Sequence, residues 1–68
     1  MKELLFLVED AAEGGFTARA IGVPLFTEAD TLGDLKQAIR DAVRCHFDPG
    51  DEPRMLRLHV VREEVITP

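Results

Sequence analysis

An amphipathic helix in the second half of the chain is the strongest structural signal in the sequence. Between residues 32 and 47, apolar residues recur at three- and four-residue spacing, so they form one stripe along a helix. Thr31 is a good N-cap, Asp34 complements the positive end of the helix dipole, and Asp48-Pro49-Gly50 ends the helix. This single stripe needs a second layer to pack against. The residues of the stripe are Leu32, Leu35, Ile39, Ala42, Val43 and Phe47.

Four other segments have the pattern of β-strands. The first is continuously apolar, which is typical of a strand that is buried on both faces. The second alternates, and the glycine pair Gly14-Gly15 before it suits a hairpin turn. The third is short, and Pro24 at its start fits an edge position. The four predicted strands are residues 3–8, 16–21, 25–28 and 55–61.

The order of these elements predicts an α+β fold of β-β-β-α-β type. A helix between two strands implies a right-handed crossover, so the last strand is expected to lie parallel to its neighbour. Placing it beside the first strand gives a four-stranded mixed sheet of order 3-2-1-4 with one helix packed on it and two edges expected to be short. With 68 residues, the chain has room for one domain, residues 1–68.

Alternation along the strands separates the residues of the two sheet faces. The helix is expected to cover the purely apolar face, formed by Leu4, Phe6, Val8, Phe16, Ala18, Ala20, Leu56, Leu58 and Val60. The opposite face carries Leu5, Leu7, Ile21, Met55 and Val61, surrounded by Thr17, Arg19, Arg57 and His59. No second helix is predicted to cover it. A half-apolar sheet of this kind is expected to meet another chain, and the apolar tail Val65-Ile66 adds to the expectation of a homo-oligomer.

Charge and cysteine content limit the partners and the compartment. Thirteen acidic and eight basic residues give a net charge of −5, which opposes direct nucleic-acid binding and favours a basic partner. The single cysteine, Cys45, excludes an internal disulfide, so the reducing cytoplasm is the expected location. The apolar run near Met1 is too short for the core of a signal peptide and predicts no membrane segment.

The sequence predicts neither a metal site nor a catalytic site. Cys45, His46 and His59 do not have zinc-ligand spacing, the acidic residues fall mainly in turns, and the chain contains no serine. No cofactor-binding motif is present, so none is expected. A basic stripe recurs every four residues on the predicted helix. It is interpreted as a solvated helix surface, with a phosphate-rich partner as the alternative; its residues are Lys36, Arg40 and Arg44.

Two short stretches resemble the HicB-like antitoxin family. They are residues 14–20, with the sequence Gly-Gly-Phe-Thr-Ala-Arg-Ala, and residues 28–32, with the sequence Glu-Ala-Asp-Thr-Leu at the helix start. The resemblance covers about residues 3–62 and implies a truncated ribonuclease H-like fold without nuclease activity. Because the chain ends at Pro68, it resembles the short, solitary branch that lacks a C-terminal DNA-binding segment. Ala29 stands where the family usually has glycine.

The resemblance implies a non-catalytic module that neutralises HicA, a small basic toxin that cleaves messenger RNA. The alternative is a self-associating structural or regulatory homo-oligomer without a toxin partner. The residues expected to contact a partner are Arg19, Arg57 and His59 on the sheet face, with Glu9, Asp10, Glu28 and Asp30 at the rim. The basic stripe on the helix is the competing surface.

Overall fold

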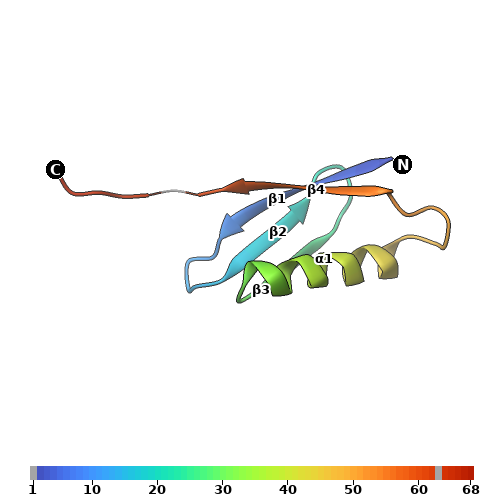
Figure 1. The fold of residues 1–68 in the computed structure, drawn as a ribbon, viewed down its shortest axis with the longest axis horizontal. Helices are drawn as coiled ribbons and strands as arrows, with labels where there is room; N and C mark the ends of the chain where they lie inside the picture. The colour runs from blue at the N-terminus through green and yellow to red at the C-terminus, as the bar shows by residue number, and fades with distance from the viewer. Residues whose placement is uncertain (1, 63) are drawn as a thin grey trace.

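Four strands and one helix follow one another along the chain in the predicted β-β-β-α-β order (Figure 1). The computed structural model describes residues 2–62 and 64–68. The sheet has the order β3-β2-β1-β4: β1 is antiparallel to β2 and parallel to β4, and β2 is antiparallel to β3. The predicted fold class, strand order and mixed character of the sheet are therefore confirmed. The elements are β1 (Glu3–Asp10), β2 (Phe16–Ala20), β3 (Phe26–Ala29), α1 (Leu32–His46) and β4 (Met55–Val61).

Element boundaries differ from the prediction by one or two residues. β1 continues to Asp10 because its antiparallel ladder with β2 extends until Asp10 lies opposite Phe16. β2 ends one residue early, at Ala20, although the Ile21 N–H still donates to the Leu5 carbonyl oxygen at 2.9 Å. β3 is shifted by one residue towards the helix, and α1 ends at His46.

The β1–β2 turn depends on the backbone of Gly15. The Ala11 N–H donates to the Gly15 carbonyl oxygen at 3.0 Å, and the φ of Gly15 is +81°, which favours glycine. A Cβ at this position would lie 2.6 Å from the carbonyl oxygen of Ala29, at the end of β3. Gly15 therefore allows the turn and the edge strand to approach closely.

The helix begins where the sequence predicts. The Thr31 Oγ1 accepts a hydrogen bond from the Asp34 N–H at 3.1 Å, and the Phe47 N–H donates to the Val43 carbonyl oxygen at the other end. Leu35, Ile39 and Val43 are buried against the sheet. Capping and burial of the stripe thus fix the position and the rotation of α1.

The core lies between α1 and the first two strands. It contains Leu4, Phe6 and Val8 from β1, Ala18 and Ala20 from β2, and Leu35, Ile39 and Val43 from α1. The expectation that α1 covers Leu56, Leu58 and Val60 of β4 is not met in full. Leu56 and Leu58 are only half-buried, and Val60 is 48% exposed.

Helix width and loop length explain why β4 is left uncovered. A helix with its side chains is about 10–12 Å wide and strands lie about 4.8 Å apart, so one helix covers two or three strands. Only Asp30 and Thr31 connect β3 to α1, which holds the helix beside β3 and β2. β4 consequently lies beyond the helix (Figure 1).

The two sheet edges are unequal. β3 has four residues, as expected for a short edge, but β4 has seven, so the expectation of two short edges is wrong for β4. Beyond β4, the described tail residues extend away from the sheet, and the molecule measures 52 × 19 × 18 Å (Figure 1). In this tail, Val65 is 93% and Ile66 84% exposed.

Candidate functional site

The sheet face that points away from α1 is the main candidate surface, and we call it the open face. Strand register brings its residues into rows: Leu7 lies between Arg19 of β2 and His59 of β4, and Leu5 lies beside Arg57. On β3, Phe26 lies beside Arg19. The open face consists of Glu3, Leu5, Leu7, Glu9, Thr17, Arg19, Phe26, Glu28, Met55, Arg57, His59 and Val61, with Ile21 next to Leu5.

Apolar side chains on the open face are unusually accessible. Phe26 is 63% exposed, Met55 54% and Ile21 46%. Leu5 and Val61 are also exposed. Contiguous apolar surface that is bordered by polar residues is typical of a protein-binding site.

Three residues predicted to contact a partner share the open face, but their surroundings differ. Arg57 forms an ion pair and hydrogen bond with Glu3 of the neighbouring strand. Arg19 and His59 lie on either side of Leu7, about 10 Å apart because two strand spacings separate them. Arg57 is thus partly neutralised, and Arg19 and His59 are hydrogen-bond donors near the centre of the face.

The predicted acidic rim falls on two surfaces. Glu9 and Glu28 belong to the open face, whereas Asp10 approaches Arg62 at 3.8 Å. Asp30 lies after β3, near the start of α1, and is not part of the open face. The structure therefore groups Glu28 with Arg19 on the sheet and separates Asp30 from both.

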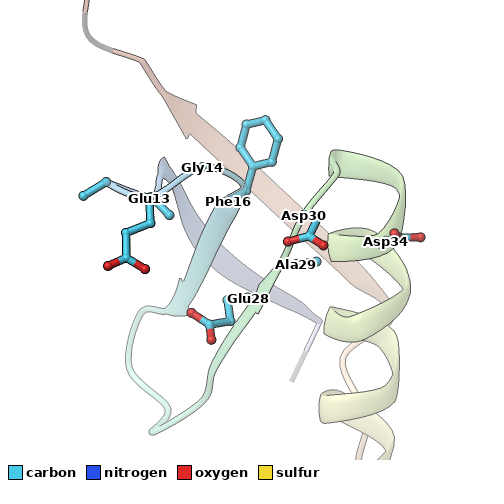
Figure 2. Close-up of a pocket in the computed structure, with 9 residues that line it drawn as sticks. Glu13, Gly14, Phe16, Glu28, Ala29, Asp30 and Asp34 are labelled. Atoms are coloured by element: carbon cyan, nitrogen blue, oxygen red, sulfur yellow. The ribbon is translucent and has the colours of Figure 1, made fainter.

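An acidic hollow adjoins the open face at Glu28. It is an open depression of about 800 Å³, located where the β1–β2 turn meets the β3–α1 connection. In Figure 2, the carboxylates of Glu13 and Glu28 extend toward one side, whereas Asp30 and Asp34 lie next to the start of α1. The residues that line the acidic hollow are Ala11, Ala12, Glu13, Gly14, Phe16, Glu28, Ala29, Asp30 and Asp34. Its four carboxylates give the hollow a negative charge, which favours cationic side chains of a partner.

A second depression, which we call the α1–β4 groove, was not anticipated from the sequence. It has a volume of about 260 Å³ and arises because α1 does not reach across β4. Ile39, Leu56 and Leu58 supply apolar surface, and the cations Lys36 and Arg40 also line it. The alternation of Leu56 and Leu58 predicted which side they face but not that the helix would stop short of them.

The basic stripe on α1 is an exposed helix surface. The Arg44 Nη1 lies 3.5 Å from the Asp41 Oδ1, and the Arg40 Nη1 donates a hydrogen bond to the Gln37 Oε1 at 3.4 Å. Such exposed pairs contribute little to stability. Lys36 and Arg40 also border the α1–β4 groove.

The residues considered for metal binding are dispersed. Cys45 is exposed, and the His46 ring lies edge-on to the Phe47 ring with centroids 4.9 Å apart. Within residues 2–62 and 64–68, no three His, Cys, Asp or Glu side chains are grouped so that they could hold a metal ion. In the same part of the chain, no helix is long and apolar enough to cross a membrane.

Together, the fold and the open face define a small α+β domain with one helix on a mixed sheet. Two relatives give the family. The chain is 46% identical over 52 residues to a UPF0150 protein of Archaeoglobus fulgidus, a match covering 76% of this chain and 77% of the relative. It is 34% identical over 65 residues to a UPF0150 protein of Thermotoga maritima, covering 96% and 91%. The chain belongs to the UPF0150 family. No family model and no solved structure matches it.

Proposed function

We propose that this protein is a non-catalytic binding module that holds a second protein on its open face. The observation that carries the proposal is the accessibility of Phe26, Met55 and Ile21 on a sheet face that α1 does not cover. Burying these side chains against a partner would remove apolar surface from water, which is the main favourable term in protein association. The interface core would be apolar, with Arg19 and His59 as donors within it.

The charge distribution favours a small basic partner. The chain carries a net charge of −5, and Glu9 and Glu28 border the apolar part of the open face. The ion pair with Glu3 reduces the repulsion that Arg57 would exert on a basic protein. Opposite net charges accelerate the encounter of two proteins, and salt weakens this steering.

The size of the open face indicates where such a partner would extend. Four strands at about 4.8 Å spacing and six residues at about 3.3 Å give a face of about 400 Å². Stable interfaces bury about 800 Å² on each partner. A tightly bound partner would therefore also contact the adjoining acidic hollow, where Glu13, Asp30 and Asp34 would receive its cationic side chains.

The resemblance to HicB-like antitoxins suggests what the binding accomplishes. A basic ribonuclease toxin of the HicA type, held on the open face, would be kept from its messenger RNA substrate. The protein would then act as the antitoxin of a type II toxin–antitoxin system. A cytoplasmic location follows from this role, because the toxin acts on messenger RNA.

Co-expression with the small basic protein encoded by a neighbouring gene tests the proposal. The neighbour should arrest growth when it is produced alone, and this chain should relieve the arrest and co-purify with it. Phe26→Glu should weaken the complex by about 30-fold or more, as loss of an interface hot spot does. The substituted side chain is 63% exposed, so the domain should still fold.

Gln37→Glu is the matched control because it adds the same charge on the exposed helix surface, where Gln37 contacts Asp41 and Arg40. It should leave both the affinity and the relief of growth arrest unchanged. If the neighbour is neither toxic nor bound, the antitoxin role is wrong. The second candidate, a self-associating regulatory protein, then takes its place, and the exposed tail residues Val65 and Ile66 favour it.

A further inference from the structure

We infer that two copies of this chain pair by placing the tail of each copy along the outer edge of the other copy's β4. In this pair, tail residues Glu64 and Ile66 of each copy lie on the α1–β4 groove of the other. The surface is distinct from the open face assigned to the partner protein. The inference follows from the unequal sheet edges, the groove and the exposed tail.

The β4 edge lacks the features that normally prevent strand pairing. Edge strands are protected by shortness, proline or charged side chains, whereas long apolar edges pair with other chains. β3 is protected because it has four residues and Pro24 lies just before it. β4 has seven residues, contains no proline, and carries Arg57, whose charge is paired with Glu3. Among the described strands, none pairs with its outer edge.

The groove and the tail have complementary chemistry. The groove combines the apolar side chains of Ile39, Leu56 and Leu58 with the cations Lys36 and Arg40. The tail carries an acidic residue, Glu64, two positions before the apolar Ile66, which is 84% exposed. A strand alternates its side chains, so Glu64 and Ile66 would share one face when the tail pairs as a strand.

One antiparallel register satisfies both contacts. When the extended segments formed by β4 and the tail of two copies pair about Val61, Ile66 of one copy lies opposite Leu56 of the other, and Glu64 lies opposite Leu58. Since Leu56 and Leu58 line the groove, Ile66 would cover its apolar part and Glu64 would approach Lys36 or Arg40. A two-fold axis at Val61 relates the two copies, so each contact forms twice and the dimer is closed.

The tail of the same chain cannot supply these contacts. Leu56 and Val65 are nine residues apart along a chain that continues away from the sheet beyond β4 (Figure 1). If the chain reversed tightly after Val61, Val65 would return only to the level of Val60, and Ile66 to that of His59. Leu56 would still be about 10 Å further along β4 than His59, at about 3.3 Å per residue. A second copy is therefore the occupant that fits.

The pairing would also widen the surface available to a partner. Each sheet would gain the partner's tail as a fifth strand beside β4, and the two open faces would lie on the same side, offset along the strand direction. The fifth strand would raise the area of each open face from about 400 Å² to about 480 Å² by the same strand spacing. Pairing of β4 and binding on the open face are thus compatible.

Sedimentation equilibrium of the full chain at micromolar concentration tests the inference. The wild type should be a dimer of the 7.6 kDa chain, and Ile66→Asp should raise the dimer dissociation constant by about 30-fold or more. Folding of the variant is checked by circular dichroism, and it should be unchanged because Ile66 is exposed. Glu64→Lys should weaken the dimer about fivefold, and combining it with Lys36→Glu and Arg40→Glu should restore it.

Phe26→Glu separates this inference from the proposed function. It should leave the dimer intact while weakening partner binding by about 30-fold or more, since Phe26 lies at the far edge of the open face, on β3. A wild-type monomer would overturn the inference. So would a dimer that tolerates Ile66→Asp, or one that Phe26→Glu dissociates.

Discussion

Replacing Ile39 with alanine measures how much the α1 stripe contributes to stability. Ile39 is 1% exposed and lies in the middle of α1, between Leu35 and Val43. All three belong to the core cluster that contains Phe6 of β1. The substitution removes Cγ1, Cγ2 and Cδ1 and leaves the helical backbone intact, because alanine is the best helix former.

The expected loss follows from the surroundings of the side chain. Transfer of the three carbon groups contributes about 2.4 kcal/mol, at about 0.8 kcal/mol for each. A residual cavity adds about 24 cal/mol per Å³, but the α1–β4 groove forms one wall of this space. Lys36 and Leu58 can close into it, so the cavity term is small. We expect Ile39→Ala to cost about 3 kcal/mol, in the lower half of the range for such substitutions.

A loss of this size is large for a chain of 68 residues. At about 0.05–0.15 kcal/mol per residue, the whole domain has a free energy of unfolding of about 3–10 kcal/mol. The midpoint of thermal unfolding should fall by about 12–24 °C, at about 4–8 °C for each kcal/mol. The chain has neither tryptophan nor tyrosine, so urea and thermal unfolding are followed by far-ultraviolet circular dichroism.

Ile21→Ala is the matched control. The chemical change is the same, but Ile21 is 46% exposed and follows the end of β2. Its cost should be less than half that of Ile39→Ala. Equal losses for the two variants, or a midpoint shift of only a degree or two for Ile39→Ala, would refute the reasoning that the stripe forms the core.

Two further substitutions test local features of the fold by the same unfolding measurements. Thr31→Ala should cost about 1 kcal/mol, because the Asp34 N–H loses its acceptor at the helix start, and Thr31→Ser should restore most of it. Gly15→Ala should cost more than about 1–3 kcal/mol, since a positive φ is combined with a Cβ 2.6 Å from the Ala29 carbonyl oxygen. Gly14 also has a positive φ, but a Cβ there would meet open space, so Gly14→Ala should show the cost of backbone strain alone. Equal costs for Gly14→Ala and Gly15→Ala would exclude a contribution from the contact with the Ala29 carbonyl oxygen.

Periodicity predicted the elements because it reflects local chemistry. The apolar stripe around Leu35 and Ile39 predicted a helix and the side of it that faces the sheet. The alternation of residues 55–61 predicted a strand with two different faces. The same alternation correctly put Arg19, Arg57 and His59 on one side of the sheet. Their role in binding a partner stays a prediction.

Contacts between distant segments could not be obtained in this way. Pairing of Arg57 with Glu3 depends on the β1–β4 register, which places Glu3 opposite Met55. Asp30, expected at the rim of the same surface as Glu28, lies instead by the helix start, because β3 ends between them. A shift of one residue in register moves every side chain of a strand to the other face, and a strand that ends one residue earlier leaves the next side chain outside the sheet.

The sequence by itself determined the order of the elements, the helix cap, the rotation of α1 and the faces of the strands. Each of these depends on neighbours within a few residues along the chain. The tertiary structure decided that α1 lies beside β3 and β2 and shares a core with β1, that β4 is left as a long accessible edge, and that a groove opens beside it. The reason is geometric: one helix is too narrow to cover four strands, and the two-residue connection after β3 determines which strand remains uncovered.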